Sequence, residues 1–290
     1  MEGNSRWSLI TALAPMAWGT NYFVTHEFLP AGHPLYGAAI RALPAGVLLL
    51  AICRRLPSGS WWWKSPVLGF LNMGGFFALV YVAAQRLPTS VASTVMATSP
   101  LAMTLIAWAL IAERPRPAHL AGAGVGAGGV CLMLLTSTVS IDALGVLASV
   151  AAMAMSSLGY ILAKRWGSEV DVLAATSWQL MAGGLLLLPL AAVVEGSPPA
   201  LDGPSLAGFG YITVVATALA FVAWFAGLRH LPAATVGLVG LLNPVTGVLL
   251  GTAIAGEALT AQQVCGLLLV LTGILLGRPA ARGDRRPRPT

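Results

Sequence analysis

Charged residues are scarce in this sequence. Asp, Glu, Lys and Arg together make up only 9% of the 290 residues, whereas hydrophobic residues make up 57%. A soluble globular domain carries roughly 25% charged residues, so a soluble chain of this composition could not cover its surface with polar groups. The composition excludes an ordinary soluble fold and predicts a protein whose outside mostly contacts lipid.

Residues that form disulfides or bind metals are also few. The sequence holds three cysteines, Cys53, Cys131 and Cys265, which is an odd number, and they are spread far apart. Its four histidines do not follow the spacing of metal ligands. We therefore expect no disulfide framework, no metal site and no cofactor.

The hydrophobic residues form continuous runs of roughly 20 residues and do not alternate with polar ones. In a bilayer every backbone polar group must be paired, so a spanning chain forms helices or a closed barrel. Barrel strands alternate apolar and polar residues over about ten positions, which is not the pattern here. The sequence predicts an all-α integral membrane protein with ten transmembrane helices. They are expected at Ser8–Val24, Pro34–Cys53, Pro66–Ala84, Thr89–Ala112, Pro117–Leu135, Asp142–Ala163, Asp171–Val194, Pro204–Leu228, Ala233–Ala255 and Ala261–Gly277.

The basic residues divide unequally between the two sides that these helices define. If the N-terminus is cytoplasmic, 14 of the 16 Lys and Arg residues fall in inner loops or tails, while Arg86 falls outside and Arg41 lies within the second helix. Cytoplasmic loops carry an excess of Lys and Arg. We therefore expect a multi-pass protein of the cell (inner) membrane with both termini in the cytoplasm. The 14 residues are Arg6, Arg54, Arg55, Lys64, Arg114, Arg116, Lys164, Arg165, Arg229, Arg278, Arg282, Arg285, Arg286 and Arg288.

One segment of the sequence has a near twin later in the chain. The run ATSPLAMTLIAWALIAERP at 97–115 returns about 144 positions later as LLNPVTGVLLGTAIAGEAL, which pairs Pro100 with Pro244 and Glu113 with Glu257. The repeating unit is about 140 residues long and holds five expected helices. Because five is odd, the second copy enters the membrane from the opposite side, an inverted repeat typical of secondary transporters.

This duplication divides the chain into two repeats and a tail. We expect five-helix repeats over 1–138 and 139–278, followed by a basic cytoplasmic tail over 279–290. A short basic tail after a last span is expected to lie on anionic lipid and not to bind nucleic acid. The expected partners are a small-molecule substrate and membrane lipids, with homodimer formation left open.

The paired prolines fall near the middle of the fourth and ninth expected helices. Each proline lacks an N–H and crowds the carbonyl four residues back, at Met96 for Pro100 and at Gly240 for Pro244. We expect both helices to kink there, near the bilayer midplane where transporter sites lie. Two readings stay open, because the kinks either line a binding site or serve packing and motion alone.

Several of these motifs together resemble a known family. They are AWGTN at 17–21, Arg41, and RLPTSVAS…SP…E from Arg86 to Glu113, with the counterparts Gln179 and HLPAATVG…NP…E from His230 to Glu257. Over about residues 8–277 the chain resembles the EamA branch of the drug/metabolite transporter superfamily. The resemblance implies a ten-helix permease, an exporter of small metabolites that are often amino acids or related compounds. This family often has Trp-Ala or Trp-Gly in the sixth helix, whereas this chain has Leu158–Gly159, which puts a symmetric aromatic role for Trp18 in doubt.

A sparse set of polar and aromatic residues lies within the expected helices. A site built from them would have aromatic walls and amide or hydroxyl hydrogen bonds, which suits small amphipathic or zwitterionic solutes. The alternative for each residue is a hydrogen bond to a neighbouring helix, worth under about 1–2 kcal/mol. The candidate binding residues are Trp18, Asn21, Tyr22, Arg41, Tyr81, Ser99, Tyr160, Trp178, Gln179, Trp224 and Asn243.

Arg41 is the one fixed charge within an expected helix. One reading is that it faces a central cavity and attracts a carboxylate or another anionic group of the substrate, with Gln179 as its neutral counterpart. The other reading is that its long side chain reaches the headgroups or caps carbonyls of an adjacent helix. The sequence leaves both readings open.

The run GVGAGG at 124–129 matches the pattern of a dinucleotide-binding loop. Such a loop needs a preceding strand and a downstream acidic residue, whereas this run lies inside an apolar helix. The pairs Gly122–Gly126 and Gly124–Gly128 instead predict faces on which a neighbouring helix approaches closely.

Two classes of function agree with a multi-spanning membrane protein. A permease would use the two repeats for alternating access, whereas an intramembrane enzyme acting on lipid-like substrates would need an acid, base or metal at reactive depth. No Asp or Glu falls clearly within an expected helix, since Glu113, Asp142, Asp171 and Glu257 all lie at helix ends. The sequence therefore favours a transporter with no catalytic residues over an enzyme.

Overall fold

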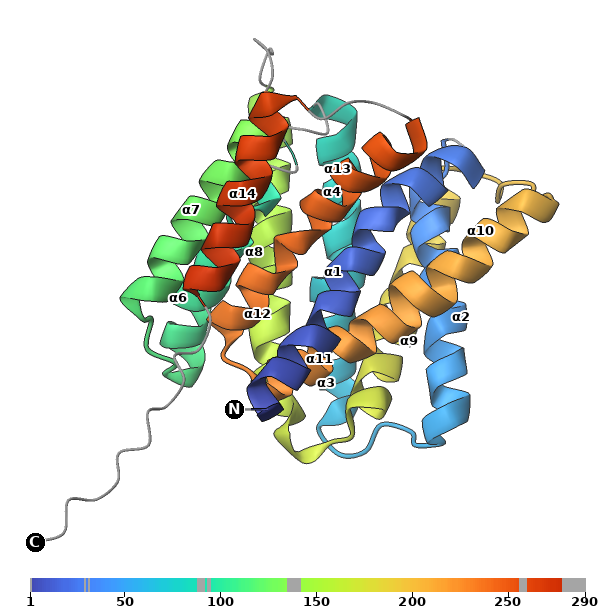
Figure 1. Cartoon of the computed structure of the whole chain (residues 1–290). Helices are drawn as coiled ribbons and strands as arrows, with labels where there is room; N and C mark the ends of the chain where they lie inside the picture. Colours follow the sequence, from blue (N-terminus) through green and yellow to red (C-terminus); the bar gives the residue numbers. More distant parts are fainter. Residues whose placement is uncertain are drawn as a thin grey trace, which may run out of the picture.

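The protein is described by a computed structural model covering residues 2–28, 30, 32–87, 92, 95–134, 142–255 and 260–277. Within these residues the chain forms helices and no strand, so the expected all-α class is confirmed. The helices pack as a bundle with both long and interrupted members (Figure 1). They are α1 (Glu2–Phe28), α2 (Pro34–Cys53), α3 (Trp61–Gly69), η1 (Phe70–Gly74), α4 (Gly75–Arg86), α6 (Ser99–Ile111), α7 (Pro117–Leu134), α8 (Ala143–Trp166), η2 (Gly167–Glu169), α9 (Val172–Val194), α10 (Gly203–Thr213), η3 (Val214–Leu219), α11 (Ala220–His230), α12 (Ala233–Gly240), α13 (Leu242–Ala255) and α14 (Ala261–Leu276).

Six described helical segments are long and apolar enough to cross a membrane, while Ser99–Ile111 and Ala261–Leu276 are shorter apolar helices. The expected number of ten spans stays a prediction. The six segments are Pro34–Cys53, Trp61–Ala83, Ala143–Glu169, Val172–Val194, Gly203–His230 and Ala233–Leu250.

Two helices begin more than one turn earlier than the sequence suggested. The first expected helix, Ser8–Val24, extends over Glu2–Phe28. The third was expected to begin at Pro66 but begins at Trp61, where the Lys64 amide already donates to the Ser60 carbonyl. The added turns of α1 hold Glu2, Asn4 and Arg6, which a reading based on apolar runs leaves out, whereas α3 begins with three tryptophans before Lys64.

Aspartate side chains cap the starts of three helices, α8, α9 and α10. The carboxylate of Asp142 accepts from the Gly145 amide at 2.7 Å, and Asp171 accepts from the first amides of α9. Asp202 accepts from the Ser205 amide at 2.8 Å, and hydrogen bonds from Ser205 lower the pKa of the Asp202 carboxyl. These are N-caps that satisfy amides left without an intrahelical partner.

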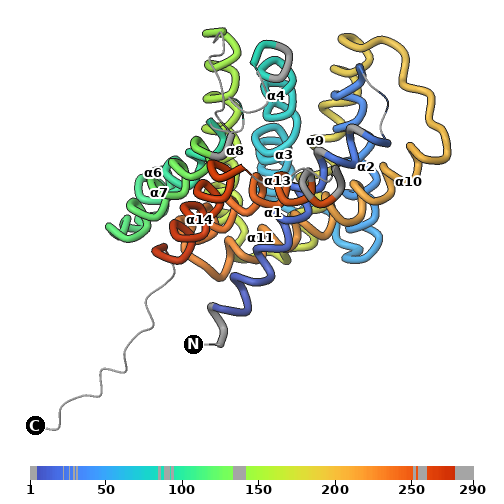
Figure 2. Tube along the Cα trace, turned by 45° about the horizontal axis from the view of Figure 1, so that its top comes forward, coloured from blue at the N-terminus to red at the C-terminus, as the bar shows by residue number. Residues whose placement is uncertain are grey.

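Helices α7 and α14 lie side by side at one edge of the bundle in Figures 1 and 2. A methyl group at Gly122 would lie 2.5 Å from the carbonyl oxygen of Gly273, and one at Gly129 would lie 2.6 Å from that of Gly266. Only glycine permits this approach, because any Cβ would collide with backbone. In the duplicated sequence Gly122 matches Gly266 and Gly129 matches Gly273, so each of these contacts is the counterpart of the other.

The prediction that two glycine pairs on α7 face neighbouring helices is right for one pair and wrong for the other. A methyl group at Gly126 would collide with the Leu241 side chain, so Gly122 and Gly126 do face neighbouring helices. Methyl groups at Gly124 and Gly128 would meet nothing within 4 Å. No described helix packs against α7 at these two glycines, and spacing alone could not say which of the two faces is covered.

Contacts between α2 and α9, which pack along each other, also come in pairs related by the duplicated sequence. A methyl group at Gly46 would lie 2.6 Å from Cγ of Met181, and one at Gly184 would lie 2.6 Å from Cγ of Leu43. The Ser177 hydroxyl also donates to the Gly46 carbonyl at 2.8 Å. Small residues therefore bring α2 and α9 close enough for side chains of one to reach the backbone of the other.

Two long helices each contain a π-helical segment. Segment η1 joins α3 to α4 and begins at Phe70, and η3 joins α10 to α11 and begins at Val214. The interval between Phe70 and Val214 equals the one that separates Pro100 from Pro244. A π-helical turn leaves part of the regular hydrogen-bond ladder open and often marks a functional position.

The chain is interrupted just before each paired proline. Turn residues Ala97 and Thr98 precede α6, and Leu241 separates α12 from α13. Pro100 and Pro244 therefore lie in the first turn of the following helix, where a missing amide is tolerated. The two interrupted helices meet directly, because a methyl group at Gly237 would lie 2.9 Å from Cα of Pro100.

One end of the bundle gathers basic residues. Figure 1 shows the start of α1 and the end of α14 at this end. The Trp7 and His230 rings stack there at 3.6 Å, and Arg229 donates to the carbonyl of Val170 at 3.0 Å. We call it the basic end and define it by Arg54, Arg55, Lys64, Lys164 and Arg229.

The opposite end carries different contacts. The Glu195 carboxylate accepts from the amides of Leu35 and Tyr36 at 2.6 and 2.9 Å and so caps α2. Arg86 lies 3.7 Å from Asp142 in an ion pair. Each loop contact thus joins segments that the distribution of basic residues assigns to the same side.

Candidate functional site

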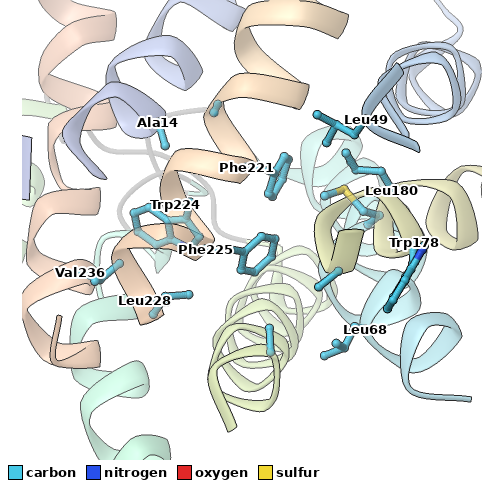
Figure 3. Packing of buried hydrophobic residues seen from close by; sticks show 14 of the residues in the cluster. Ala14, Leu49, Leu68, Trp178, Leu180, Phe221, Trp224, Phe225, Leu228 and Val236 are labelled. Carbon is cyan, nitrogen blue, oxygen red and sulfur yellow. The ribbon is translucent and has the colours of Figure 1, made fainter. Parts of the chain in front are cut away.

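An aromatic cluster occupies the core between α1, α8 and α11. Trp18 contacts Phe221 and Trp224 with ring centroids 5.1 and 5.2 Å apart, and Tyr160 contacts Trp224 at 5.4 Å and Phe225 at 6.1 Å. Figure 3 shows Phe221, Trp224 and Phe225 projecting from α11. These five rings pack against one another through large apolar surfaces, and we call them the aromatic cluster.

Polar atoms in and beside this cluster are buried without a hydrogen-bond partner in the described part of the chain. They include Nε1 of Trp224, whose side chain is only 3% exposed, and the Oδ1 atoms of Asn21 and Asn243. A methyl group at Gly19 would lie 2.7 Å from the Asn243 carbonyl oxygen, so α1 touches the start of α13 here. An unpaired buried polar atom costs about 1–3 kcal/mol, and a ligand that supplies an acceptor and donors would recover this cost.

Arg41 reaches from α2 to the π-helical segment η3. Its Nε donates to Oγ1 of Thr217 at 2.8 Å, and its Nη2 donates to the Ala216 carbonyl at 3.0 Å. The same carbonyl accepts from Nε1 of Trp18 at 3.0 Å. The guanidinium also lies 5.8 Å from the centroid of the Phe77 ring. Arg41 and Trp18 therefore hold η3 in place together.

Arg41 makes no ion pair with any residue that the structure describes. The carbonyl and hydroxyl that it binds are neutral, so they solvate the guanidinium without cancelling its charge. A cation within a membrane-spanning segment usually pairs with another charge or marks a substrate pathway. The geometry thus agrees with both readings of Arg41, as a brace for η3 and as a contact for an anionic group.

Gln179, the repeat counterpart of Arg41, makes the corresponding contact on the other π-helical segment. Its Oε1 accepts from Nδ2 of Asn72 in η1 at 2.9 Å, and its Nε2 donates to the Ala175 carbonyl at 3.1 Å. Gln179 is 1% exposed. Arg41 and Gln179 thus each bind the π-helical segment of the helix that packs beside them, one with a charge and one without.

Other candidates lie apart from the cluster. Trp178 is at the basic end, where its Nε1 donates to the Arg55 carbonyl at 2.8 Å and its ring contacts Trp61, and Figure 3 shows it away from Trp224. Tyr81 packs beside Phe77 and the start of α2. Ser99 lies in the first turn of α6. The Tyr22 side chain, Glu257 and the tail 279–290 lie outside the described residues.

Several residues of this region did not stand out in the sequence. Phe221 and Phe225 are ordinary apolar residues, and Ala216 and Thr217 contribute a carbonyl and a hydroxyl only because η3 presents them to Arg41. The one usable signal was the pairing of Phe77 with Phe221 in the duplicated sequence. Both of these rings lie next to a candidate residue, Arg41 in one case and Trp18 in the other.

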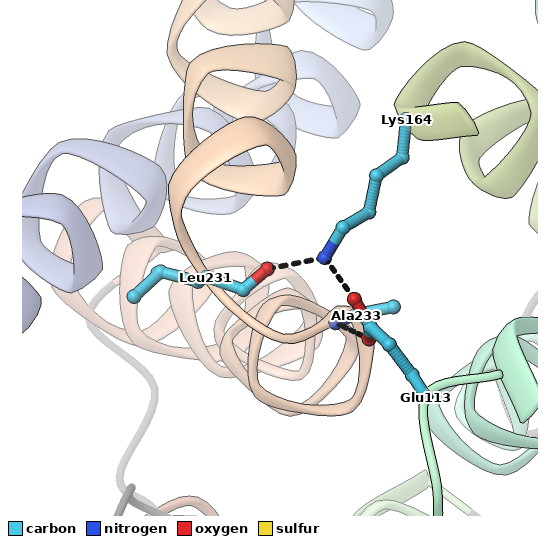
Figure 4. Close-up of polar contacts among 4 residues, drawn as sticks. All are labelled: Glu113, Lys164, Leu231 and Ala233. Atoms are coloured by element: carbon cyan, nitrogen blue, oxygen red, sulfur yellow. Dashed lines mark hydrogen bonds and ion pairs between the residues drawn. The ribbon is translucent and has the colours of Figure 1, made fainter. Parts of the chain in front are cut away.

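A polar network joins three helices at the basic end (Figure 4). Lys164 Nζ lies 2.5 Å from Oε1 of Glu113 and donates to the Leu231 carbonyl at 2.6 Å. The other carboxylate oxygen of Glu113 accepts from the Ala233 amide at 2.8 Å. The network ties the ends of α6 and α8 to the turn between α11 and α12.

A small cavity opens beside this network. It is lined by residues of α8, α9 and α11, including Lys164 and Arg229 at the basic end and Gln179 and Phe225 toward the core. Among the described residues there is no group of three or more His, Cys, Asp or Glu side chains that could hold a metal ion. The site is therefore built from rings, amides, hydroxyls and one guanidinium.

Known proteins resemble this chain over nearly its whole length. The model of the EamA-like transporter family matches residues 5–135 and again residues 143–277. Protein PecM of Dickeya dadantii (strain 3937) is 34% identical over 277 residues, which covers 95% of this chain and 93% of that protein. The uncharacterized transporter YwfM of Bacillus subtilis (strain 168) is 30% identical, with 98% and 97% covered.

Two further comparisons agree with these. The uncharacterized inner membrane transporter YedA of Escherichia coli (strain K12) is 28% identical, with 89% of this chain and 86% of that protein covered. A solved crystal structure matches 94% of this chain and 96% of its own with a TM-score of 0.82 and 21% sequence identity. That structure supports the fold alone.

Proposed function

Because the chain belongs to the EamA-like transporter family of drug/metabolite membrane transporters, we propose that it is a ten-span permease that exports small amphipathic metabolites. The transported solutes are amino acids and related compounds. Transport proceeds by alternating access between two inverted repeats, each of five spans.

Matched contacts between the two halves support the inverted repeat. The glycine contacts between α7 and α14 come in equivalent pairs, as do those between α2 and α9. The π-helical segments and the breaks before Pro100 and Pro244 also fall at equivalent positions. Two halves with equivalent contacts can exchange conformations, so that one arrangement opens the site inward and the other outward.

The single observation that carries the substrate class is the set of unpaired polar atoms beside the aromatic cluster. Trp224 offers an unused donor, and Asn21 and Asn243 offer unused acceptors. Arg41 adds a positive charge without an acidic partner among the described residues. A solute with an apolar body, an amine and a carboxylate would satisfy these groups together.

Orientation forms part of the proposal. We place the basic end in the cytoplasm because Lys and Arg accumulate there, which makes both termini cytoplasmic. Cysteines introduced at Glu113 and Glu257 should then react from opposite sides of the membrane. Labelling of both from the same side would contradict the inverted repeat.

The proposed function is tested by transport in proteoliposomes with a panel of amino acids and related solutes. Trp224→Phe removes the unused donor while keeping an aromatic ring, so it should weaken the apparent affinity for the transported solute about fivefold to tenfold. The matched control is Trp108→Phe, because Trp108 is 54% exposed on the outer surface of the bundle. Equal effects of both substitutions, or no transport of any member of the panel, would contradict this site.

The same assay separates a permease from an intramembrane enzyme. A permease delivers its solute chemically unchanged, so the mass of the recovered solute should equal that of the solute supplied. A product of different mass that requires the protein would favour the enzyme.

A further inference from the structure

Three indole rings surround the side-chain amine of Lys64 at the basic end. Lys64 Nζ lies 5.7 Å from the ring centroid of Trp61, 5.9 Å from that of Trp63 and 5.7 Å from that of Trp166. Trp63 and Trp166 contact each other edge to face at 5.2 Å, so the cage joins α3 to α8. Cations are attracted to the faces of indole rings, and the three rings together favour this position of the amine.

The cage holds this amine without cancelling its charge. Ring faces are neutral, and Lys64 forms no ion pair within the part of the chain that the structure describes. The acidic residues of the neighbouring α8–α9 turn, Glu169 and Asp171, do not lie within ion-pair distance of Lys64, and Asp171 caps α9 instead. A fixed positive charge thus remains available to a ligand.

Further positive charge is held close to the cage. The Arg55 carbonyl accepts from Nε1 of Trp178 at 2.8 Å, and the Trp178 ring contacts Trp61 at 5.4 Å. This contact pins the loop after α2, in which both Arg54 and Arg55 are exposed. The cage therefore lies in a locally basic surface.

An apolar stripe runs along α3 to the first residue of η1, away from Lys64. Trp63, Val67 and Phe70 are 54%, 37% and 47% exposed, and their spacing of four and three residues places them on one face of the helix. All three residues lie in the apolar segment Trp61–Ala83, which is long enough to cross a membrane. A cationic head site at the end of a span, followed by an apolar stripe within it, matches the two parts of a phospholipid.

We propose that Lys64 and its indole cage bind the phosphodiester head group of an anionic phospholipid of the phosphatidylglycerol class. One acyl chain of this lipid lies along Trp63, Val67 and Phe70. The site is separate from the aromatic cluster and does not depend on which solute is transported. Interfacial tryptophans favour the headgroup level of the membrane, and basic residues there attract anionic lipids.

Native mass spectrometry of the full chain, purified with phosphatidylglycerol or phosphatidylcholine, tests this site. The wild-type protein should retain phosphatidylglycerol in preference to phosphatidylcholine. Lys64→Gln should lower the amount of bound phosphatidylglycerol about fivefold. Lys64→Arg keeps the charge over the rings, so it should bind as much phosphatidylglycerol as the wild-type protein. The matched control is Arg114→Gln, which removes one exposed charge from the same end outside the cage and should change little.

Three results would overturn the proposal. Equal losses in Lys64→Gln and Arg114→Gln would mean that the basic end attracts lipid without a specific site. Competition by millimolar inorganic phosphate would mean that the cage binds soluble anions. Equal retention of the two lipids by the wild-type protein would exclude recognition of the head-group charge. This comparison needs no variant, so it tests the proposal even if Lys64→Gln fails to fold.

Discussion

Lys164 and Glu113 form an ion pair at 2.5 Å that joins the end of α8 to the end of α6 (Figure 4). Their side chains are 15% and 31% exposed, so water screens the pair only partly. Both partners also bind backbone atoms on either side of Pro232, through the Leu231 carbonyl and the Ala233 amide. The pair thus fixes the turn between α11 and α12 against both neighbouring helices.

Glu113→Gln should loosen this end of the bundle. The substitution leaves Lys164 without its charge partner, and the loss of a partly exposed pair costs on the order of 1 kcal/mol, or about a fivefold shift in the local opening equilibrium. A cysteine replacing the buried Ala233, in a background without the three native cysteines, should then react about fivefold faster with maleimide. The matched control is Arg86→Gln, which breaks the exposed pair with Asp142 at the other end and should leave that rate unchanged. A rate that does not respond to Glu113→Gln would mean that the pair does not hold this end closed.

The two readings of Arg41 predict different transport results. If the guanidinium binds a substrate carboxylate, Arg41→Gln should weaken affinity for carboxylate-bearing solutes roughly tenfold, the factor for about 1.4 kcal/mol, while neutral analogues keep theirs. If Arg41 only braces η3, all solutes should be affected alike. Arg41→Lys keeps the charge but loses the fork geometry, so it should preserve charge attraction and weaken the brace. Unchanged affinity for carboxylate-bearing solutes in Arg41→Gln would exclude the anion contact.

The paired prolines should matter more for turnover than for folding. Pro100→Ala and Pro244→Ala restore a backbone donor in a first helical turn where proline is already tolerated, so unfolding free energy should change by about 1 kcal/mol or less. A more continuous helix would resist bending at the break, and the transport rate should fall at least about threefold at unchanged expression. Full transport by the double variant would assign both prolines to packing.

The glycines of α7 offer a matched test of helix packing. Gly122→Val places a side chain against the Gly273 backbone and should destabilise the protein by about 1–3 kcal/mol, the usual cost of overpacking. Gly124→Val points where nothing lies within 4 Å and should be nearly neutral. Thermal unfolding in detergent measures both, and a similar loss in the two variants would mean that helix propensity, and not the contact, sets the cost.

Local features of the sequence were enough to predict the helical class and some of the helix contacts. Long apolar runs predicted helices because lipid leaves the backbone no other partner than itself. Glycine spacing on α7 predicted close packing, but not that the Gly122 face is covered and the Gly124 face open. That choice depends on where α14 lies, which no local pattern contains.

The candidate site shows the same division. Trp18, Trp224 and Tyr160 meet in one cluster, whereas Trp178 contacts the Arg55 loop at the basic end. Trp178 and Trp224 both lie in apolar helices, so the sequence alone made them equally good candidates for the site. Their different places follow from the depth and face at which α9 and α11 cross the bundle.

The sequence by itself determined the lipid environment, the helical class and the duplication, because each depends on composition or on residues compared along the chain. Only the tertiary structure decided which polar atoms are used and which stay unpaired. Arg41 binds Ala216 and Thr217 because a π-helical turn presents these atoms to α2, while Nε1 of Trp224 finds no acceptor among the residues that the structure describes. Such pairings depend on the relative positions of helices far apart in the chain, and these positions are fixed by packing across the bundle.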